Sequence, residues 1–102
     1  MYLVNTSFVV EPNLLERWIG IIKQSYIPLL DKAGFTVAAF SRVISVDPIE
    51  HFTYSLLVEV PDMARYKELT EDLFGEYLAI ADPMFGSGVL WFTTLMKKED
   101  LP

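Results

Sequence analysis

The sequence predicts an α+β fold of the ferredoxin-like type, with the element order β-α-β-β-α-β. Four segments have strand-like composition, two longer segments repeat apolar residues every three or four positions, and turn-forming residues separate them. Right-handed crossovers then place two helices on one face of a four-stranded antiparallel sheet. The length of 102 residues fits a single ferredoxin-like domain, residues 1–102.

The first strand is predicted over residues 2–10, where side chains alternate between two faces. One face carries aromatic and β-branched residues, which favour strands. The other face carries Asn5 and Ser7 between Leu3 and Val9. This strand can therefore be partly buried on both sides.

The first helix is predicted over residues 13–33, where apolar residues form one face. Pro12 suits its first turn, and Gly34 is a favourable residue at its end. Pro28 disfavours α geometry at Ile27 and removes one backbone hydrogen bond, so we expect a kink there. We interpret this stretch mainly as a kinked core helix, with a cleft under the kink as the alternative.

The second strand, residues 35–46, is apolar on both faces apart from Arg42 and a few hydroxyls. This composition is typical of a strand buried on both sides. The turn-forming residues 47–50 predict an antiparallel return through a third strand, residues 51–60.

The second helix is predicted to begin at Asp62, a suitable N-cap residue, and to end at Asp82-Pro83. A stripe of aromatic and aliphatic residues runs along it. A glycine-containing loop, residues 85–88, leads into a last apolar strand, residues 89–96.

The sheet face opposite the helices needs a cover. Because both faces carry apolar side chains, the pattern leaves open which face meets the helices. A composition that is 52% hydrophobic predicts a sheet-on-sheet homodimer. The expected interface combines apolar and small polar residues: Leu3, Val9, Leu57, Asn5, Ser7, Thr53 and Ser55.

Charge and composition exclude several classes of function. A net charge of −6 without a basic cluster argues against nucleic acid and anionic membranes as partners. The absence of cysteine and the single histidine predict no disulfide, no metal site and no cofactor. Residues 1–12 do not resemble a signal peptide, and no apolar run reaches membrane-spanning length, so we expect a cytoplasmic protein.

Three residues are candidates for catalysis. Asn5 can orient a carbonyl or oxyanion, and His51 beside Glu50 can serve as an acid or base. Tyr26, in the kinked stretch, can assist as a polar group. We favour structural roles for Asn5 and His51, because buried polar groups mostly satisfy hydrogen bonds and a histidine at a strand end is usually solvated.

Five residues are candidates for ligand binding. Large aromatic residues with polar tips can line a pocket for a small apolar or aromatic molecule. The alternative is ordinary core packing. Arg42 is the one candidate without an aromatic ring. It can hold an anionic ligand, although we favour an ion pair with a carboxylate. The candidates are Trp18, Tyr26, Tyr54, Tyr66 and Arg42.

Motifs spread along the chain carry a family resemblance: Tyr2, Asn5-Thr6, Trp18, Ile27-Pro28, Gly34-Phe35, Thr53-Tyr54, Phe85-Gly86 and Phe92-Thr93-Thr94-Leu95. Through them the chain resembles a bacterial family described as domain of unknown function 4286, in the dimeric α/β-barrel superfamily. The resemblance implies the fold and a homodimeric α/β-barrel rather than an activity. Relatives often carry histidine before Ile-Pro, where this chain has Tyr26, so any proton-transfer role of that histidine does not carry over.

Three functions remain open. The first is a small-molecule-binding homodimeric domain with an apolar or aromatic ligand between helices and sheet. The second is an enzyme resembling the cofactor-independent monooxygenases or lyases of the same superfamily, which use such a cleft. The third is a non-catalytic dimerisation or protein-interaction domain with acidic outer helices, which predicts a core without a ligand-sized cavity.

Overall fold

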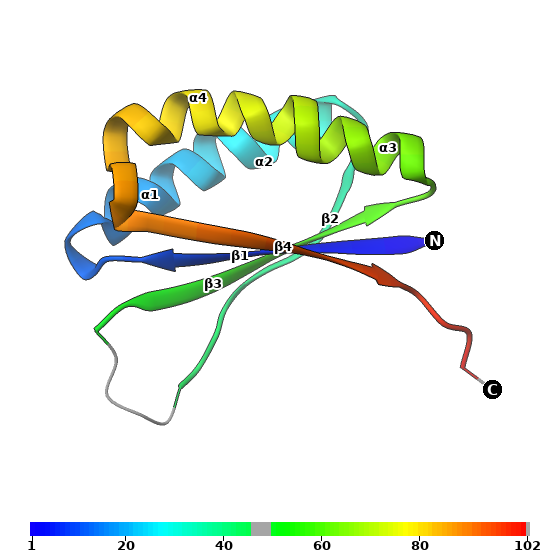
Figure 1. Ribbon diagram of the computed structural model, residues 1–102, viewed down its shortest axis with the longest axis horizontal. Coiled ribbons are helices and arrows are strands. Elements are labelled where there is room, and N and C mark those ends of the chain that lie inside the picture. The colour runs from blue at the N-terminus through cyan, green and yellow to red at the C-terminus, as the bar shows by residue number, and fades with distance from the viewer. Residues whose placement is uncertain (46–49, 102) are drawn as a thin grey trace.

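The computed structural model of the protein describes residues 1–45 and 50–101, and it confirms the βαββαβ order (Figure 1). Residues 47–49 of the predicted turn lie outside the described residues. The strands are β1 (Tyr2–Val10), β2 (Thr36–Arg42), β3 (Phe52–Val60) and β4 (Val89–Lys97). The first helical arm comprises η1 (Pro12–Leu14), α1 (Leu15–Ile21), η2 (Ile22–Tyr26) and α2 (Ile27–Lys32). The second comprises α3 (Met63–Lys67), η3 (Glu68–Leu73), α4 (Phe74–Phe85) and η4 (Gly86–Gly88).

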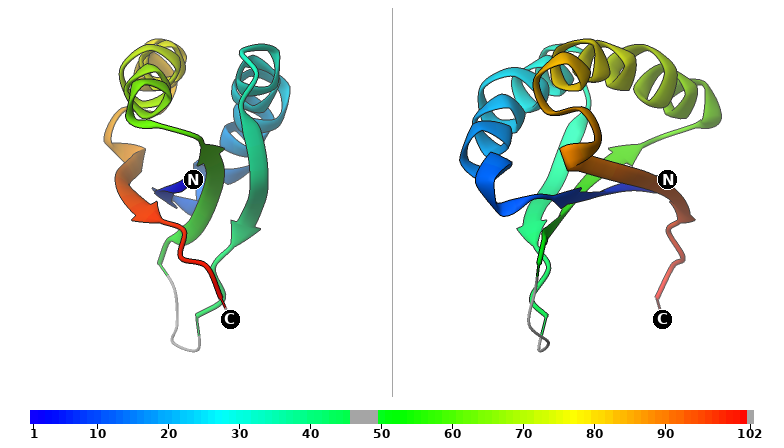
Figure 2. Two further views of the ribbon diagram at one scale, coloured as in Figure 1. Left: turned by 90° about the vertical axis from the view of Figure 1, so that its right-hand side faces the viewer. Right: turned by 60° about the vertical axis from the view of Figure 1, so that its left-hand side comes forward.

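The four strands form one antiparallel sheet in the order β2-β3-β1-β4. Strand β1 is central, and Phe8 lies opposite Tyr54 of β3 on one side and Trp91 of β4 on the other. Both helical arms run side by side over the same face of the sheet (Figures 1 and 2). This arrangement confirms the one that the crossover rule predicts.

The hydrophobic core lies between the helical arms and the sheet. Alternate residues of β1, Val4, Phe8 and Val10, are almost completely buried, and Trp18 and Leu30 meet them from the first arm. Burying a side chain of this kind contributes about 1.5–3 kcal/mol to folding. The question of which sheet face meets the helices is thereby answered: it is the face that excludes Asn5 and Ser7.

The first helical arm changes its hydrogen-bonding period before Pro28. Segment η2 is a π-helix, and the Ile27 N–H donates to the carbonyl of Ile22, five residues back. Contrary to expectation, Ile27 keeps α geometry, with φ −61° and ψ −45°. The wider π-helical turn lies immediately before Pro28. In a regular α-helix the proline ring would clash with the preceding turn, and its nitrogen could not donate a hydrogen bond. The arm therefore continues through Pro28 to Lys32.

Gly34 ends the first arm as predicted. Its φ of +84° is a left-handed conformation that a glycine adopts without strain. The Phe35 N–H then donates to the Leu30 carbonyl at 2.9 Å, and the Gly34 N–H donates to Asp31 at 3.0 Å. These bonds satisfy the last helical carbonyls.

The second helical arm begins as predicted but ends later. The Asp62 side chain accepts a hydrogen bond from the Arg65 N–H at 2.9 Å, which confirms the N-cap. The predicted end at Asp82-Pro83 is wrong, because α4 runs on to Phe85. Pro83 removes one helical hydrogen bond, whereas the buried side chains of Ala81 and Phe85 hold the last turn against the core.

The expectation that the second strand is buried on both faces is wrong. Strand β2 lies at an edge of the sheet, and five of its seven residues are exposed. Strand β4 at the other edge is also exposed along most of its length. Apolar composition on both faces therefore does not mean burial here, since burial depends on where a strand lies in the sheet.

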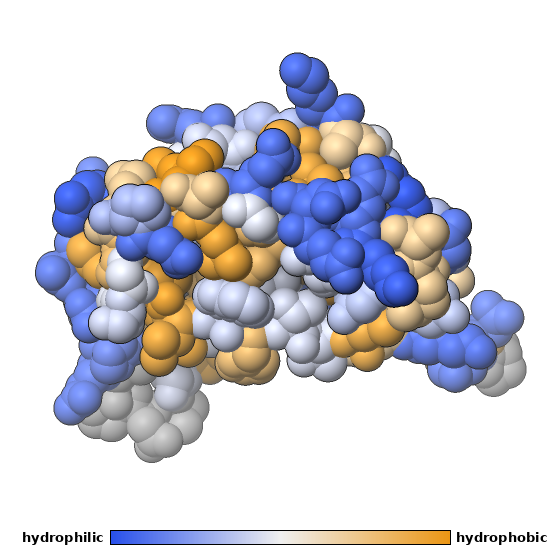
Figure 3. All heavy atoms as spheres, turned by 45° about the horizontal axis from the view of Figure 1, so that its top comes forward, coloured by the Kyte–Doolittle hydropathy of each residue, from blue (hydrophilic) through white to orange (hydrophobic). Residues whose placement is uncertain are grey.

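The sheet face turned away from the helices has no cover within the described chain, as Figure 1 shows. Residues directly opposite one another in the register share this uncovered face. Its members are Leu3, Asn5, Ser7 and Val9 of β1, Thr36, Ala39 and Ser41 of β2, Thr53, Ser55, Leu57 and Glu59 of β3, and Leu90, Phe92, Thr94 and Met96 of β4. The helical side, in contrast, presents many hydrophilic residues to solvent (Figure 3).

Candidate functional site

An aromatic network joins the two helical arms to the sheet. The Trp18 indole N–H donates to the Tyr77 hydroxyl at 2.9 Å, in the buried interior. The Tyr77 ring lies 5.0 Å from the Tyr26 ring and 5.7 Å from the Phe8 ring, centroid to centroid. Each pair of this kind adds about 0.5–1.5 kcal/mol beyond the area it buries. The network makes this the best-connected part of the core.

Burial controls the ionisation of both tyrosines. It raises the pKa of Tyr26 far above the ordinary value, and the neighbouring Tyr77 adds to the rise. Burial also raises the pKa of Tyr77, to about 12, with the Trp18 hydrogen bond lowering it and Asp82 raising it. Both phenols therefore stay protonated near neutral pH, so they act as hydrogen-bonding groups and not as bases.

The structure brings three of the predicted ligand-binding residues into this network. The Trp18 ring lies 5.3 Å from the Tyr54 ring, and Tyr54 stacks on Phe40 at 5.3 Å. Tyr26 reaches Trp18 through Tyr77. Because Trp18 is 0% exposed and Tyr26 is 3% exposed, a ligand in contact with either one must displace part of the core.

The other two predicted ligand-binding residues lie elsewhere. Tyr66 is half-buried in α3. Arg42 is exposed at the end of β2, where its guanidinium lies 4.5 Å above the centre of the Phe52 ring. Arg42 thus makes a cation–π contact, and among residues 1–45 and 50–101 no ion pair of its guanidinium is found. An ion pair does form between Arg65 and Glu68, one turn apart in the second arm.

The catalytic candidates Asn5, Tyr26 and His51 do not come together. Asn5 lies on the uncovered face and Tyr26 on the opposite, helix-covered side. His51 is exposed and directly precedes β3, whose first residue, Phe52, is paired with Val10 at the far end of β1 from Asn5. The sheet therefore separates Asn5 from Tyr26, and five strand positions, about 17 Å, separate Val10 from Asn5.

Asn5 belongs to a polar cluster within the uncovered face. Its side-chain amide donates to the Ser7 hydroxyl at 3.1 Å, and its side-chain carbonyl accepts a hydrogen bond from Ser55 on β3. Ser7 is only 8% exposed. The cluster ties β1 to β3 on a face that is otherwise largely apolar, which agrees with the structural interpretation of Asn5.

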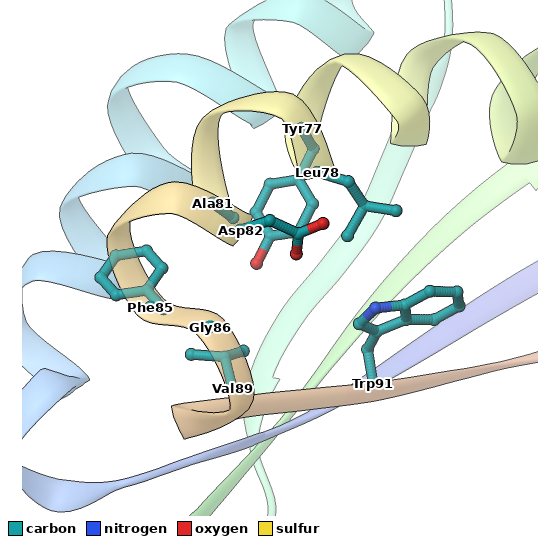
Figure 4. A pocket seen from close by; sticks show the side chains of 8 residues that line it. All are labelled: Tyr77, Leu78, Ala81, Asp82, Phe85, Gly86, Val89 and Trp91. Carbon is teal, nitrogen blue, oxygen red and sulfur yellow. The ribbon is translucent and has the colours of Figure 1, made fainter.

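A small hollow opens between α4 and the start of β4 (Figure 4), and we call it the α4–β4 hollow. Its volume is about 10 Å³. Tyr77 forms its inner side, while Asp82 and the 43% exposed Trp91 stand at its mouth. The lining is completed by apolar residues: Leu78, Ala81, Phe85, Gly86 and Val89.

The sequence singled out only part of this hollow. Tyr77 and Trp91 are recognisable as aromatics with polar tips, but their position around one hollow with Asp82 depends on how α4 meets the start of β4. The Asp82-Pro83 pair resembles a helix terminator, so no local signal points to Asp82 as part of a site.

A wider, open groove of about 470 Å³ lies between α2 and the start of β2. Ile27 and Pro28 line it from the helix, and Phe35 and Val37 line it from the strand side. Ile27 and Pro28, where the sequence predicts a kink, therefore border a groove at the β2 edge of the sheet. Tyr26 and Leu30 of the same arm are buried in the core.

Within residues 1–45 and 50–101, no group of three or more His, Asp or Glu side chains is arranged to hold a metal ion. Over the same described ranges, no helix has the length and apolar character required to span a membrane.

The sheet order and the two helices over one face define a ferredoxin-like domain. The chain belongs to the family described as domain of unknown function (DUF4286), whose family model matches residues 1–99. No curated protein sequence matches the chain.

Solved structures show the same fold at low sequence identity. A dimeric ferredoxin-like protein from an uncultured marine organism has a TM-score of 0.61 and 15% identity, with 100% of both chains covered. A protein of the ethyl tert-butyl ether D (EthD) family from Bacillus halodurans has a TM-score of 0.60 and 10% identity, covering 97% of this chain and 100% of that one. An antibiotic biosynthesis monooxygenase has a TM-score of 0.59 and 14% identity, covering 98% and 100%. At these identities the likeness concerns the fold alone.

Proposed function

We propose that this protein is a cytoplasmic homodimer in which two copies pack sheet on sheet, as in a dimeric α/β-barrel, and that each copy binds a small apolar or aromatic molecule between helices and sheet. The observation that carries the proposal is the uncovered face. Leu90 is 59% exposed, Phe92 58% and Met96 39%, all on that face. Apolar groups gathered on one exposed surface mark an interaction site.

The charge of the uncovered face favours a second copy as its occupant. Glu59, at one end, is the one charged residue among its members, although the chain as a whole carries a net charge of −6. An approaching copy is repelled least where both surfaces lack charge. In a two-fold dimer the same surface of both copies meets, so two nearly uncharged faces come into contact.

The size of the uncovered face is adequate for a dimer. Three of the strands have nine residues, about 30 Å, and β2 has seven. The four strands together span about 19 Å, which amounts to roughly 600 Å² for each copy. Two copies then bury about 1,200 Å², the lower end of the range for specific interfaces. The Asn5–Ser7–Ser55 cluster would be enclosed at its centre.

The α4–β4 hollow supports the ligand part of the proposal. It combines apolar walls with the polar tips of Tyr77 and Asp82, which is the kind of lining that small-molecule sites have. In this proposal Trp18 and Tyr26 shape the site indirectly, through their contacts with Tyr77.

The test measures assembly and binding separately. Sedimentation equilibrium of the purified protein is expected to give twice the mass of the chain at micromolar concentration. A single-chain mass that persists at millimolar concentration would contradict the dimer. Thermal-shift assays with aromatic, quinone and haem-like compounds are expected to show stabilisation by at least one class, and a flat response to all of them would contradict ligand binding.

A further inference from the structure

The α4–β4 hollow has room for one small polar group. Its volume of about 10 Å³ is close to the minimum that holds a single water-sized group. The side chains of Ala81, Phe85 and Val89 make the rest of its wall apolar. A ring cannot enter a space of this size, but the polar head of a molecule can, while its body stays at the mouth.

Tyr77 and Asp82 provide a donor and an acceptor at this hollow. The Trp18 indole donates to the Tyr77 oxygen at 2.9 Å from the core side, which leaves the phenol proton for another partner. The Asp82 carboxylate offers acceptor oxygens. Figure 4 shows the Tyr77 hydroxyl and the Asp82 carboxylate both directed toward the hollow that these residues line.

Trp91 provides a flat surface at the mouth. Its ring is 43% exposed, and the Phe74 ring holds it in an edge-to-face contact with centroids 4.6 Å apart. A partly exposed indole that is fixed in this way offers its free surface to another aromatic ring at little cost in side-chain entropy.

We propose that the α4–β4 hollow binds the hydroxyl group of a phenol: Tyr77 donates to the phenol oxygen, the phenol proton is donated to Asp82, and the ring of the phenol lies on Trp91. The inference rests on the small-molecule binding proposed above and names its ligand class. An ammonium group cannot accept from Tyr77, and a carboxylate cannot donate to Asp82. A hydroxyl does both.

The test compares phenol with toluene, which has the same ring and no hydroxyl. The chain has two tryptophans, so ¹H–¹⁵N spectra contain two indole signals, one at each end of the site. Phenol is expected to shift both signals and to bind at least tenfold more tightly than toluene. Asp82→Asn and Tyr77→Phe are each expected to weaken phenol binding at least tenfold. Glu76→Gln is the matched control, because it also removes a negative charge, from an exposed residue next to Tyr77 in the sequence. It is expected to leave phenol binding unchanged.

Each alternative result has a distinct meaning. Equal binding of phenol and toluene would overturn hydroxyl recognition while leaving apolar ligand binding intact. Unshifted indole signals with both probes would mean that the hollow holds only water, which also overturns the inference. Asp82→Asn keeps the Trp18–Tyr77 hydrogen bond, so it tests the site even if Tyr77→Phe proves to be misfolded. Sedimentation of the same samples reports the dimer independently of either result.

Discussion

Trp18 and Tyr77 are 59 positions apart in the sequence, yet the indole N–H of one donates to the hydroxyl of the other at 2.9 Å. Both side chains are buried, so each polar tip is satisfied without water. The bond joins the first helical arm to the second. Its partners also contact Tyr54 and Tyr26, which extends the connection to β3 and to η2.

Tyr77→Phe is expected to lower the free energy of unfolding by about 1–3 kcal/mol, because it leaves the Trp18 N–H buried without an acceptor. Urea denaturation followed by tryptophan fluorescence measures the change. Tyr66→Phe, which removes a hydroxyl from a half-buried ring of the same arm, is the control and is expected to change it by less than about 0.5 kcal/mol. Equal effects of the two substitutions would contradict the role of the bond.

Alkaline pH is expected to destabilise the fold through the buried tyrosines. The pKa of Tyr77 rises from 10.0 to about 12 on folding, mainly by burial, and the pKa of Tyr26 rises as well. Because the pKa is higher in the folded state than in the unfolded state, the folded protein keeps the phenol proton up to a higher pH. The stabilisation is complete below pH 10 and is lost as pH rises through the folded pKa, by at most about 1.4 kcal/mol per pH unit for each proton.

Urea midpoints measured at intervals from pH 9 upward, the range that brackets the unfolded pKa of 10.0, test this sign. Wild type is expected to weaken progressively above pH 10, and Tyr77→Phe is expected to weaken less steeply because it has one titrating phenol fewer. A stability that increases over this range would contradict burial as the dominant cause.

Phe92→Glu is expected to dissociate the proposed homodimer, since it places a charge on the uncovered face of each copy, where two-fold symmetry would bring the charges together. Association is expected to weaken at least hundredfold, which corresponds to about 3 kcal/mol. Sedimentation velocity measures it. Ile80→Glu changes an apolar residue of similar exposure, 43%, on the helical side and is expected to leave the dimer intact. A dimer unaffected by Phe92→Glu would place the interface elsewhere.

Two glycines are expected to respond in opposite directions to alanine. At Gly20 in α1, an added methyl group meets nothing within 4 Å, so Gly20→Ala is expected to stabilise the fold by about 0.5–1 kcal/mol through helix propensity. At Gly34 the φ of +84° strains any other residue, so Gly34→Ala is expected to destabilise by about 1–2 kcal/mol. Thermal melts of the two variants side by side test both signs.

The fold was predictable from the sequence because the residue patterns that indicate its helices, strands and turns each span only a few neighbouring positions. Alternation in β1, the apolar stripes of both helical arms, the Asp62 cap and the Gly34 end each depend on a few neighbouring residues. Two errors arose where packing overrides a local preference. Ile27 keeps α geometry beside a π-helical turn, and α4 passes Pro83 because its last turn is anchored in the core.

The candidate site was predictable only in part. Trp18, Tyr26 and Tyr54 lie in one aromatic network of the core, whereas Asn5 and His51 lie apart from them. The pairing of Tyr77 with Trp18, and their position beside Asp82 and Trp91, depends on how an arm and an edge strand meet.

The sequence by itself determined the element order, the arm boundaries within a few residues and the excess of apolar side chains, because hydrogen-bonding period and residue chemistry act over short distances. Only the tertiary structure decided which sheet face the helices cover, which strands lie at the edges and which polar tips meet in the interior. Those choices depend on contacts between segments tens of residues apart, which no local pattern encodes.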